Sequence, residues 1–371
     1  MMIAFSLSLV RMPQQHRIAL PGFRFQEMMK ASDGIWMYDI LDNAWFAWHA
    51  WLVIVTADMM GSAKVNGTTG VSGVHGNRFS TVEGARASDK GKQQYYPITN
   101  YEGVLARLAN AKNDKERKEI AKETGIIRLP LLAASFAHIY PYFFTPDCLH
   151  QFYANNANHL HRLMLECGHL PRDKAEKFGY MLETAKATLP ATFCGPICNI
   201  HTKLNTSYKL FEWMAVVHWY TIPFLISLGV NNEVVSNYAM FVRITEFSME
   251  VVPRTESELR ELEALIIDFL TGFERLYITD PSQICRARIT LFQLIHIPNC
   301  IRWYGSYRIC SQATCEQTIG YLGRKVRSDK SPFQNLANLI VENEVIKCLK
   351  LYYPHLVPTN PARFLLTLSI S

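Results

Sequence analysis

The sequence predicts an α+β protein, in which a short β-rich region is followed by a longer and mostly helical chain. Of the 371 residues, 49% are hydrophobic and 12% are aromatic, which is enough apolar side chain for a large core and excludes a disordered chain. Strand-like patterns are confined to the chain before Tyr101, and helical spacing dominates after it.

Residues 34–58 predict two strands around a turn. Two runs rich in aromatic and β-branched residues predict the strands. Asp42 and Asn43 lie between these runs, and Asp and Asn favour turns. The second run is almost continuously apolar, which is typical of a strand buried on both faces. The Gly-, Ser- and Thr-rich residues 61–91 predict a loop. We therefore expect residues 18–100 to form a short mixed β region.

Helical patterns fill most of residues 101–350. Residues 105–125 carry dense charge and predict an exposed helix that ends at Gly125. Thr255 and Glu258 form a capping box, which marks a helix start. The apolar residues that follow at helical spacing are Leu259, Leu262, Ile266, Phe269, Leu270 and Phe273. Further helices are predicted at 149–167, 174–188 and 212–228.

Charge and cysteine content limit the cellular context. The chain has 38 Lys and Arg against 32 Asp and Glu, a mild excess that permits an anionic partner such as DNA. No apolar run reaches the roughly 18 residues that a membrane span requires. The first positive charge follows the N-terminal apolar run, unlike in a secretion signal. Nine irregularly spaced cysteines suit a reducing compartment, so we expect a nuclear or cytoplasmic protein without a membrane partner.

Three acidic or basic positions are candidates for metal chemistry. Asp58 ends the apolar strand, where α/β nucleases and transferases place metal ligands; alternatively, it caps the next segment. Asp147 and His150 lie three apart at the start of a predicted helix, so both can face one side and bind or orient a metal. The alternative is an N-capping Asp with a partly buried His.

Other polar groups point less clearly to function. His159 and His161 are two apart on a helix and diverge, so we interpret them as solvated or core-edge residues. Cys194 and Cys198 lack a second pair of ligands at zinc spacing. A basic cluster after Glu316 is either a solvated face or a set of phosphate contacts for a nucleic acid. It consists of Arg324, Lys325, Arg327 and Lys330.

In their order along the chain, these segments resemble the CACTA-type (En/Spm) and related KDZ-type transposases of eukaryotes, fungal copies in particular. LPGFRFQEMMKASDGIWMYDILDNAWFAWHAWLVIVTAD resembles the block in which a strand ends in a catalytic Asp, here Asp58. HGNRFSTVEGARASDKGKQQYYPI resembles the block that normally carries a CxxC pair, and PDCLHQFYANNANHL resembles the Asp-x-x-His signature. The resemblance covers about residues 18–350.

The resemblance implies an RNase H-like catalytic fold with a large, mostly helical insertion and C-terminal region. It divides the chain into a partial core at 18–165 with a degenerate CxxC loop, a helical insertion and C-terminal transposase region at 166–350, and a tail at 351–371. The implied chemistry is phosphodiester cleavage and strand transfer with two Mg²⁺ or Mn²⁺ ions. The implied metal ligands are Asp58, Asp147 and Glu316, and His150 would support the site or the DNA strand.

Three departures from the family pattern predict an inactive copy that keeps some affinity for DNA. The strand with the first catalytic Asp is missing upstream of Gly22. Asn77 and Ser80 replace the two thiolates, so we expect no structural zinc. Ala313, Thr314 and Cys315 replace the usual residues before Glu316. One alternative is an active enzyme in which a carboxylate such as Asp39 substitutes for the first Asp; another is a host-recruited helical module that binds DNA or protein through residues 208–350.

Overall fold

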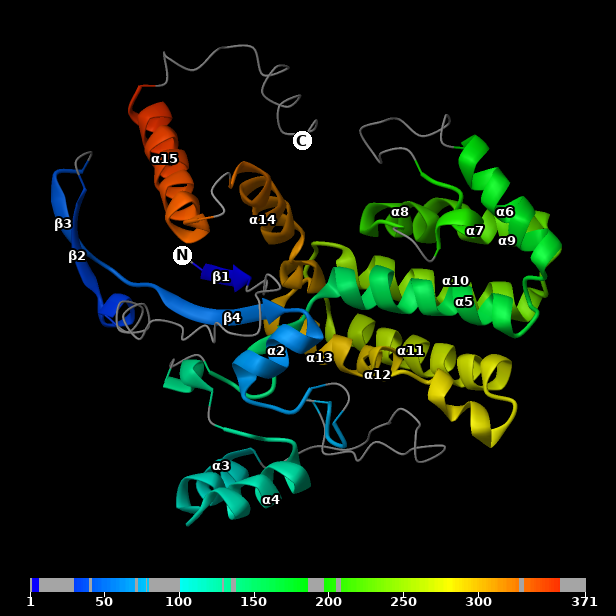
Figure 1. Ribbon diagram of the computed structural model, residues 1–371, viewed down its shortest axis with the longest axis horizontal. Helices are drawn as coiled ribbons and strands as arrows, with labels where there is room; N and C mark the ends of the chain where they lie inside the picture. Colours follow the sequence, from blue (N-terminus) through cyan, green and yellow to red (C-terminus); the bar gives the residue numbers. More distant parts are fainter. Residues whose placement is uncertain are drawn as a thin grey trace. The chain divides into compact units, whose positions relative to one another are not determined.

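The computed structural model describes residues 2–6, 30–39, 42–70, 73–77, 79, 101–128, 130–134, 138–185, 197–204, 208–326 and 330–353 (Figure 1). These residues are mostly helical with a few strands, which confirms the α+β class. They form two compact units, Met1–Gln312 and Ala313–Ser371, which we describe separately.

The first unit contains a three-stranded parallel sheet in the order β1-β4-β5, formed by β1 (Met2–Ser6), β4 (Trp51–Ala57) and β5 (Phe144–Pro146). β1 precedes residue 18, so the β region starts earlier than we predicted. β5 lies inside the region predicted to be helical, because a three-residue strand is too short to leave a sequence pattern.

A hairpin of β2 (Ile35–Asp39) and β3 (Ala44–Trp48) forms a separate antiparallel sheet. Its turn includes Asp42 and Asn43, as predicted, and Asn43 has a positive φ of 50°. The apolar run that we predicted to be one strand is divided into β3 and β4. The division falls at His49 and Ala50, because His49 Nδ1 bonds to Ser32 O and Ala50 N donates to Ala31 O.

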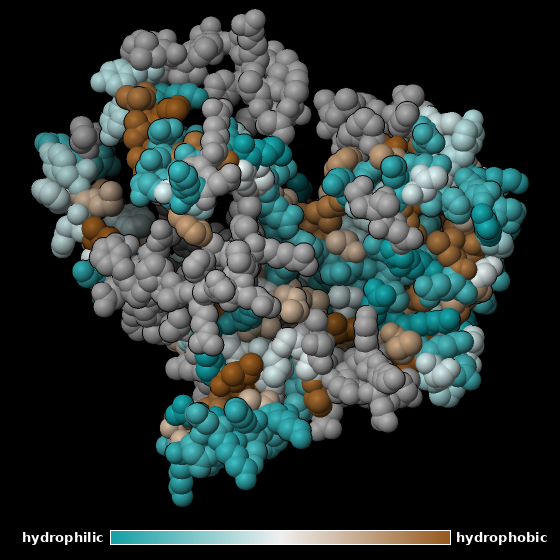
Figure 2. Space-filling model, in the orientation of Figure 1, coloured by the Kyte–Doolittle hydropathy of each residue, from teal (hydrophilic) through white to brown (hydrophobic). Residues whose placement is uncertain are grey.

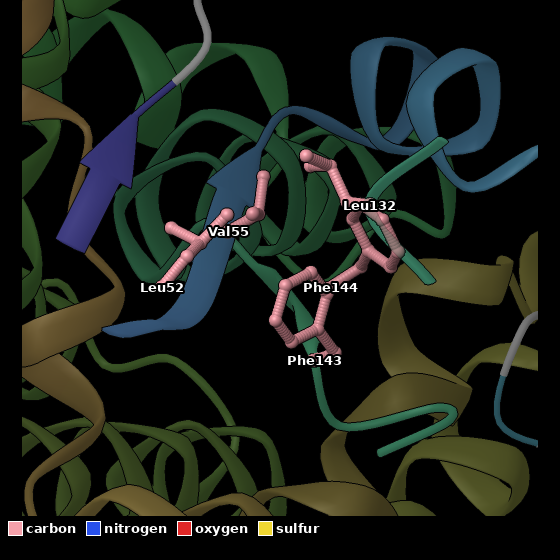
Figure 3. Close-up of a cluster of buried hydrophobic side chains, with 5 residues drawn as sticks. All are labelled: Leu52, Val55, Leu132, Phe143 and Phe144. Carbon is pink, nitrogen blue, oxygen red and sulfur yellow. The ribbon is translucent and has the colours of Figure 1, made fainter. Parts of the chain in front are cut away.

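A hydrophobic cluster holds β4 and β5 together (Figure 3). Leu52 and Val55 of β4 pack with Phe144 of β5, with Phe143 beside it and with Leu132 of the short helix η1 (Leu131–Ala134). Helix α2 (Met59–Asn66) follows β4 and contacts both β4 and β5. Burying each such side chain contributes about 1.5–3 kcal/mol, so this cluster fixes the end of β4 relative to β5.

The charged segment predicted as one helix forms two, α3 (Tyr101–Asn110) and α4 (Asp114–Thr124). Asn113 separates them, because its side chain accepts a hydrogen bond from Glu116 N and caps α4. α4 ends at Gly125, as predicted, with a φ of 75°. The charged side chains of α4 account for the strongly hydrophilic surface at the bottom of Figure 2.

The rest of the first unit is helical. The helix predicted at 149–167 begins at Cys148 and consists of a π-helical part, η2 (His150–Ala157), and α5 (Asn158–Glu166). The helix predicted at 212–228 is likewise interrupted by a π-helical part. The remaining elements are α6 (Arg172–Ala185), α7 (Ile200–Lys203), α8 (Leu210–Ala215), η3 (Val216–Tyr220), α9 (Thr221–Ser227), α10 (Asn232–Met249), α11 (Glu256–Tyr277), η4 (Pro281–Arg286), α12 (Ile289–Phe292), η5 (Gln293–His296), α13 (Ile297–Tyr304) and η6 (Tyr307–Cys310).

Helix α11 starts as the sequence predicts. Glu258 N donates to Thr255 Oγ1, and Thr255 N donates to Glu258 Oε2, so the capping box is complete. The predicted apolar face is buried except at Leu270, which is half-buried. The second unit contains α14 (Ala313–Lys325) and α15 (Pro332–Tyr352). No strand occurs among the described residues between 200 and 350, which confirms the predicted helical character of that region.

Candidate functional site

Asp58 and Asp147 follow paired residues at the ends of two neighbouring strands. Ala57 of β4 pairs with Pro146 of β5 in a parallel register, and an aspartate comes next on each strand. Carboxyl ends of parallel strands meet at one sheet edge, which is the usual place for a ligand site in open α/β sheets. The structure therefore brings together the two aspartates that the sequence singled out.

Asp58 serves as the N-cap of helix α2. Its Oδ1 accepts a hydrogen bond from Gly61 N at 2.5 Å, and its backbone carbonyl accepts one from Ser62 N. The side chain is exposed. Asp58 therefore caps the following helix, which is one of the two roles that the sequence allows. One of its two carboxylate oxygens is hydrogen-bonded to the backbone.

Asp147 is buried and surrounded by hydrogen-bond donors. Its Oδ1 accepts from Leu149 N at 3.3 Å and from Gln312 N at 3.0 Å, and its Oδ2 accepts from His150 N at 3.2 Å. The Nδ1 atom of His150 also contacts Oδ2. A carboxylate offers about four lone-pair sites, so these four protein partners use its whole capacity. Only 1% of the Asp147 side chain is exposed, against 34% for that of His150.

Residues 310–312 close over the ends of β4 and β5. Thr56 Oγ1 donates to Cys310 O at 2.8 Å, and Gln312 N donates to Asp147. These partners are 254 and 165 positions apart in the sequence. Sequence reasoning missed Thr56 and Gln312, because a single hydrogen bond between distant neutral groups leaves no motif or spacing.

Buried polar side chains of the continuous helix formed by η2 and α5 bind the segment that leads to residues 310–312. Gln151 Oε1 accepts from Tyr307 Oη at 2.5 Å, and Asn156 Nδ2 donates to Thr290 O at 3.1 Å. His159 Nε2 lies 2.6 Å from Arg286 O. The Asp-x-x-His turn is thus the first part of a polar face that binds residues 286–312.

His159 and His161 are core residues rather than solvated ones. His159 is 3% exposed and His161 is 4% exposed. His161 packs against Phe178 and Trp213, and burial lowers its pKa to about 4. The sequence analysis underestimated their burial, because both helix faces are covered here. Of the CGPIC cysteines, Cys194 lies outside the described residues and Cys198 is exposed.

Glu316 and the basic cluster belong to the second unit. Glu316 is exposed in the first turn of α14, and its assignment as the last carboxylate stays a prediction. Arg324 and Lys325 are exposed in the last turn, and the Lys325 ammonium lies 4.3 Å from the Tyr321 ring centroid. Lys330 is also exposed, whereas Arg327 lies outside the described residues.

Most of the carboxylate oxygens of Asp58 and Asp147 accept hydrogen bonds from the protein. Both carboxylate oxygens of Asp147 accept hydrogen bonds from protein donors. Of the two oxygens of Asp58, Oδ1 accepts a hydrogen bond from Gly61 N. Asp39, the proposed substitute, lies in the separate hairpin, where its Oδ1 accepts from Asp42 N. Within the described part of the chain, no three His, Cys, Asp or Glu side chains are grouped to hold a metal ion.

The degenerate CxxC loop is described only in part. Asn77, at one of the two thiolate positions, is buried, and its Oδ1 accepts a hydrogen bond from Phe79 N at 3.2 Å. Ser80, at the other position, lies outside the described residues. Asn77 therefore stabilises a local turn, and its amide does not offer the thiolate that zinc prefers.

Neither known protein families nor curated proteins provide a relative of this chain. No model of a known protein family matches the chain, and no curated protein matches it. Among the described helices, none combines the length and the apolar character that crossing a membrane would require.

Proposed function

We propose that this chain is a transposase-derived protein with an RNase H-like core, which binds DNA but neither cleaves nor joins it. The family is proposed from the order of motifs between residues 18 and 350. The loss of activity is proposed from Asp147, whose carboxylate binds three backbone N–H groups and a histidine instead of being open to an ion. That single observation carries the functional proposal.

Strand β1 supports the same proposal. β1 pairs with β4 in a parallel register that joins Ser6 to Thr56, so a strand does stand beside the one that ends at Asp58. β1 lies upstream of Gly22, where we expected the strand with the first catalytic Asp to be missing. However, none of the residues Met2–Ser6 is acidic, so the strand brings no carboxylate to the neighbourhood of Asp58. A two-metal site needs several carboxylates to hold its ions.

The proposed DNA affinity rests on the exposed cations of the second unit. Arg324 and Lys325 extend from the last turn of α14, and Lys330 follows closely. Such cations bind phosphates in any sequence, so the binding should be unspecific and should weaken steeply with salt.

A nuclease assay tests the proposal directly. The full chain is incubated with supercoiled and linear DNA in Mg²⁺ or Mn²⁺, beside its Asp58→Ala variant, and the same DNA is used in a binding titration at two salt concentrations. We expect neither protein to nick or join the DNA, and both to bind it equally. Cleavage by the parent protein that Asp58→Ala abolishes would overturn the inactive assignment and favour an enzyme with a substitute carboxylate. Absence of DNA binding at low salt would instead favour a recruited protein-binding module.

A further inference from the structure

The segment before helix α12 lies along the continuous helix formed by η2 and α5. His159 Nε2 lies 2.6 Å from Arg286 O, and Asn156 Nδ2 donates to Thr290 O at 3.1 Å. The chain between these two contacts carries Arg288, which is exposed. Arg288 is therefore held beside the helix at the level of residues 156–159.

Arg162, on α5, extends toward the same level. Its Nε donates to Asn158 Oδ1 at 2.7 Å, and its Nη2 donates to Leu204 O at 3.4 Å. Asn158 lies between the two helix positions that bind the segment, so these hydrogen bonds orient the guanidinium back along the helix. Among the described residues, the Nη1 group of Arg162 has no acceptor. Arg162 thus presents a donor in a fixed orientation.

The Arg288 guanidinium lies within range of the Arg162 charge. Its pKa is lower than usual, because partial burial disfavours the charged form and because Arg162 repels it. The exposed Glu166 carboxylate acts in the opposite sense, but no hydrogen bond or ion pair joins the Arg288 side chain to another described residue. Two neighbouring cations without an anion between them repel each other. The stability of the fold therefore does not explain their arrangement.

An oxyanion is the ligand that suits this pair. A guanidinium presents its N–H donors in one plane, where they match two oxygens of one phosphate group. Arg288 is exposed and Arg162 is half-buried, so an anion can reach both side chains from solvent. Sites for small molecules bury most of their ligand, whereas a polymer with regularly spaced phosphates can bind through separate contacts on an open surface. The two arginines therefore fit a phosphate of a nucleic-acid backbone.

We propose that Arg162 and Arg288 form a second phosphate-binding site for the DNA backbone, on the helical part of the first unit. The site rests on the proposed binding of DNA and adds to the exposed cations of the second unit, Arg324 and Lys325. Sequence reasoning missed it, because the two arginines lie far apart in the chain. Phosphate contacts position DNA without reading its sequence, so the site should bind duplexes of any sequence.

Salt-dependent binding of duplex DNA tests the site. Each phosphate contact contributes about 0.9 to the slope of log K against log salt, so Arg288→Gln should reduce the slope by about one and weaken binding about tenfold at about 0.1 M salt. Arg260→Gln is the matched control and should change neither, because Arg260 is an exposed arginine of α11 whose charge is offset by Glu256 at 3.8 Å. Arg288→Lys keeps the charge and should retain most of the slope.

The binding and stability of Arg288→Gln decide between the site and its alternatives. Parental affinity and slope in this variant would overturn the site, while the DNA binding of the protein would stand. The variant removes a repelled charge, so its Tm should equal or exceed that of the parent protein. A lower Tm would show that Arg288 stabilises the fold and would overturn its assignment as a phosphate ligand.

Inorganic phosphate identifies the source of the anion. Thermal unfolding is compared in sodium phosphate and in NaCl of equal ionic strength, and Arg288→Gln should respond to phosphate as the parent protein does, because one free phosphate lacks the neighbouring contacts of DNA. Suppose that the parent does not bind DNA at low salt but gains Tm in phosphate, and that Arg288→Gln loses this gain. The arginines would then bind a small phosphate compound, and DNA would be excluded as their ligand. If the parent binds neither DNA nor phosphate, both the site and the proposed function fail.

Discussion

At the scale of single residues, Asp147 lies where the sequence predicts a metal ligand, but its hydrogen bonds indicate a contribution to the stability of the fold. Its carboxylate accepts hydrogen bonds from the backbone N–H groups of Leu149, His150 and Gln312. Asp58, by contrast, is exposed, and within the described part of the chain its side chain accepts a hydrogen bond from Gly61 N. The two aspartates share a sheet edge, but they should differ strongly in what they contribute to the free energy of unfolding.

Alanine substitutions should reveal this difference in metal-free buffer. Asp147→Ala leaves buried N–H groups without partners and should lower the free energy of unfolding by about 3 kcal/mol or more. Asp58→Ala removes one exposed cap and should cost about 1 kcal/mol. Urea denaturation of both variants measures the two values. If Asp147→Ala were neutral or stabilising, relief of repulsion between two metal-binding carboxylates would be the better explanation.

His161 should make the stability of the protein depend on pH. Burial, together with nearby Arg162 and His201, lowers the pKa of His161 to about 4, below the value of about 6.5 in an unfolded chain. Above pH 6.5 both states are neutral at this position. As pH falls from 6.5 to 4, the unfolded state takes up the proton and the folded state does not. The free energy of unfolding should therefore fall by about 3 kcal/mol over this range.

The variant His161→Leu isolates this contribution. Urea denaturation at pH 7 and at pH 4.5 should show a smaller loss of stability for His161→Leu than for the parent protein. An identical pH dependence in the two proteins would mean that His161 is not the group responsible.

The sequence located the important residues at this scale but not their partners. Asp58 and Asp147 could be predicted because an acid directly after an apolar run, or before a helix, is a local pattern. Their capping role was one of two local interpretations. The hydrogen bonds from Thr56 to Cys310 and from Gln312 to Asp147 join residues that are far apart in the sequence. They depend on the tertiary fold, so no local sequence pattern predicts them.

At the scale of elements, the contact between helix η2–α5 and residues 286–312 depends on buried polar pairs. Tyr307 Oη donates to Gln151 Oε1 at 2.5 Å, and both side chains are buried. Tyr307→Phe should lower the free energy of unfolding by about 1–2 kcal/mol, because Gln151 loses a donor that water cannot replace. Tyr180→Phe, at a position that is 65% exposed, should change it by less than about 0.5 kcal/mol.

A double-mutant cycle with Gln151→Leu separates the pair from its surroundings. The double variant Gln151→Leu with Tyr307→Phe should be more stable than the sum of the two single effects predicts, by about 1 kcal/mol. Strict additivity of the two effects would show that the hydrogen bond does not couple the helix to η6.

Local signals explain which elements could be predicted. The capping box and apolar face of α11 are complete within a few turns, so its start and its buried face followed from the sequence. The division of the apolar run into β3 and β4 could not be predicted, because it depends on the bonds of His49 and Ala50 to residues 31 and 32. The π-helical parts η2 and η3 also lie inside runs whose spacing predicts ordinary helix.

At the scale of the whole molecule, segments from the beginning, middle and end of the first unit meet at the carboxyl end of the parallel sheet. β4, β5 and residues 310–312 all meet at Asp58 and Asp147. The α+β class followed from the sequence, because strand and helix patterns occupy different parts of the chain. The boundary at Gln312 between the two units did not, because no change of composition marks it.

Divalent metal should not stabilise this molecule if its sheet edge is closed by protein hydrogen bonds. An ion that binds only the folded state at 100 times its dissociation constant adds about 2.7 kcal/mol to the free energy of unfolding. Thermal unfolding of the full chain should instead show the same Tm in MgCl₂, in MnCl₂ and in NaCl of equal ionic strength. Asp58→Ala should have a lower Tm than the parent protein by the same amount in all three salts. A rise in Tm with Mg²⁺ or Mn²⁺ that Asp58→Ala removes would show that the exposed oxygen of Asp58 takes part in a metal site, and the inactive assignment would then have to be given up.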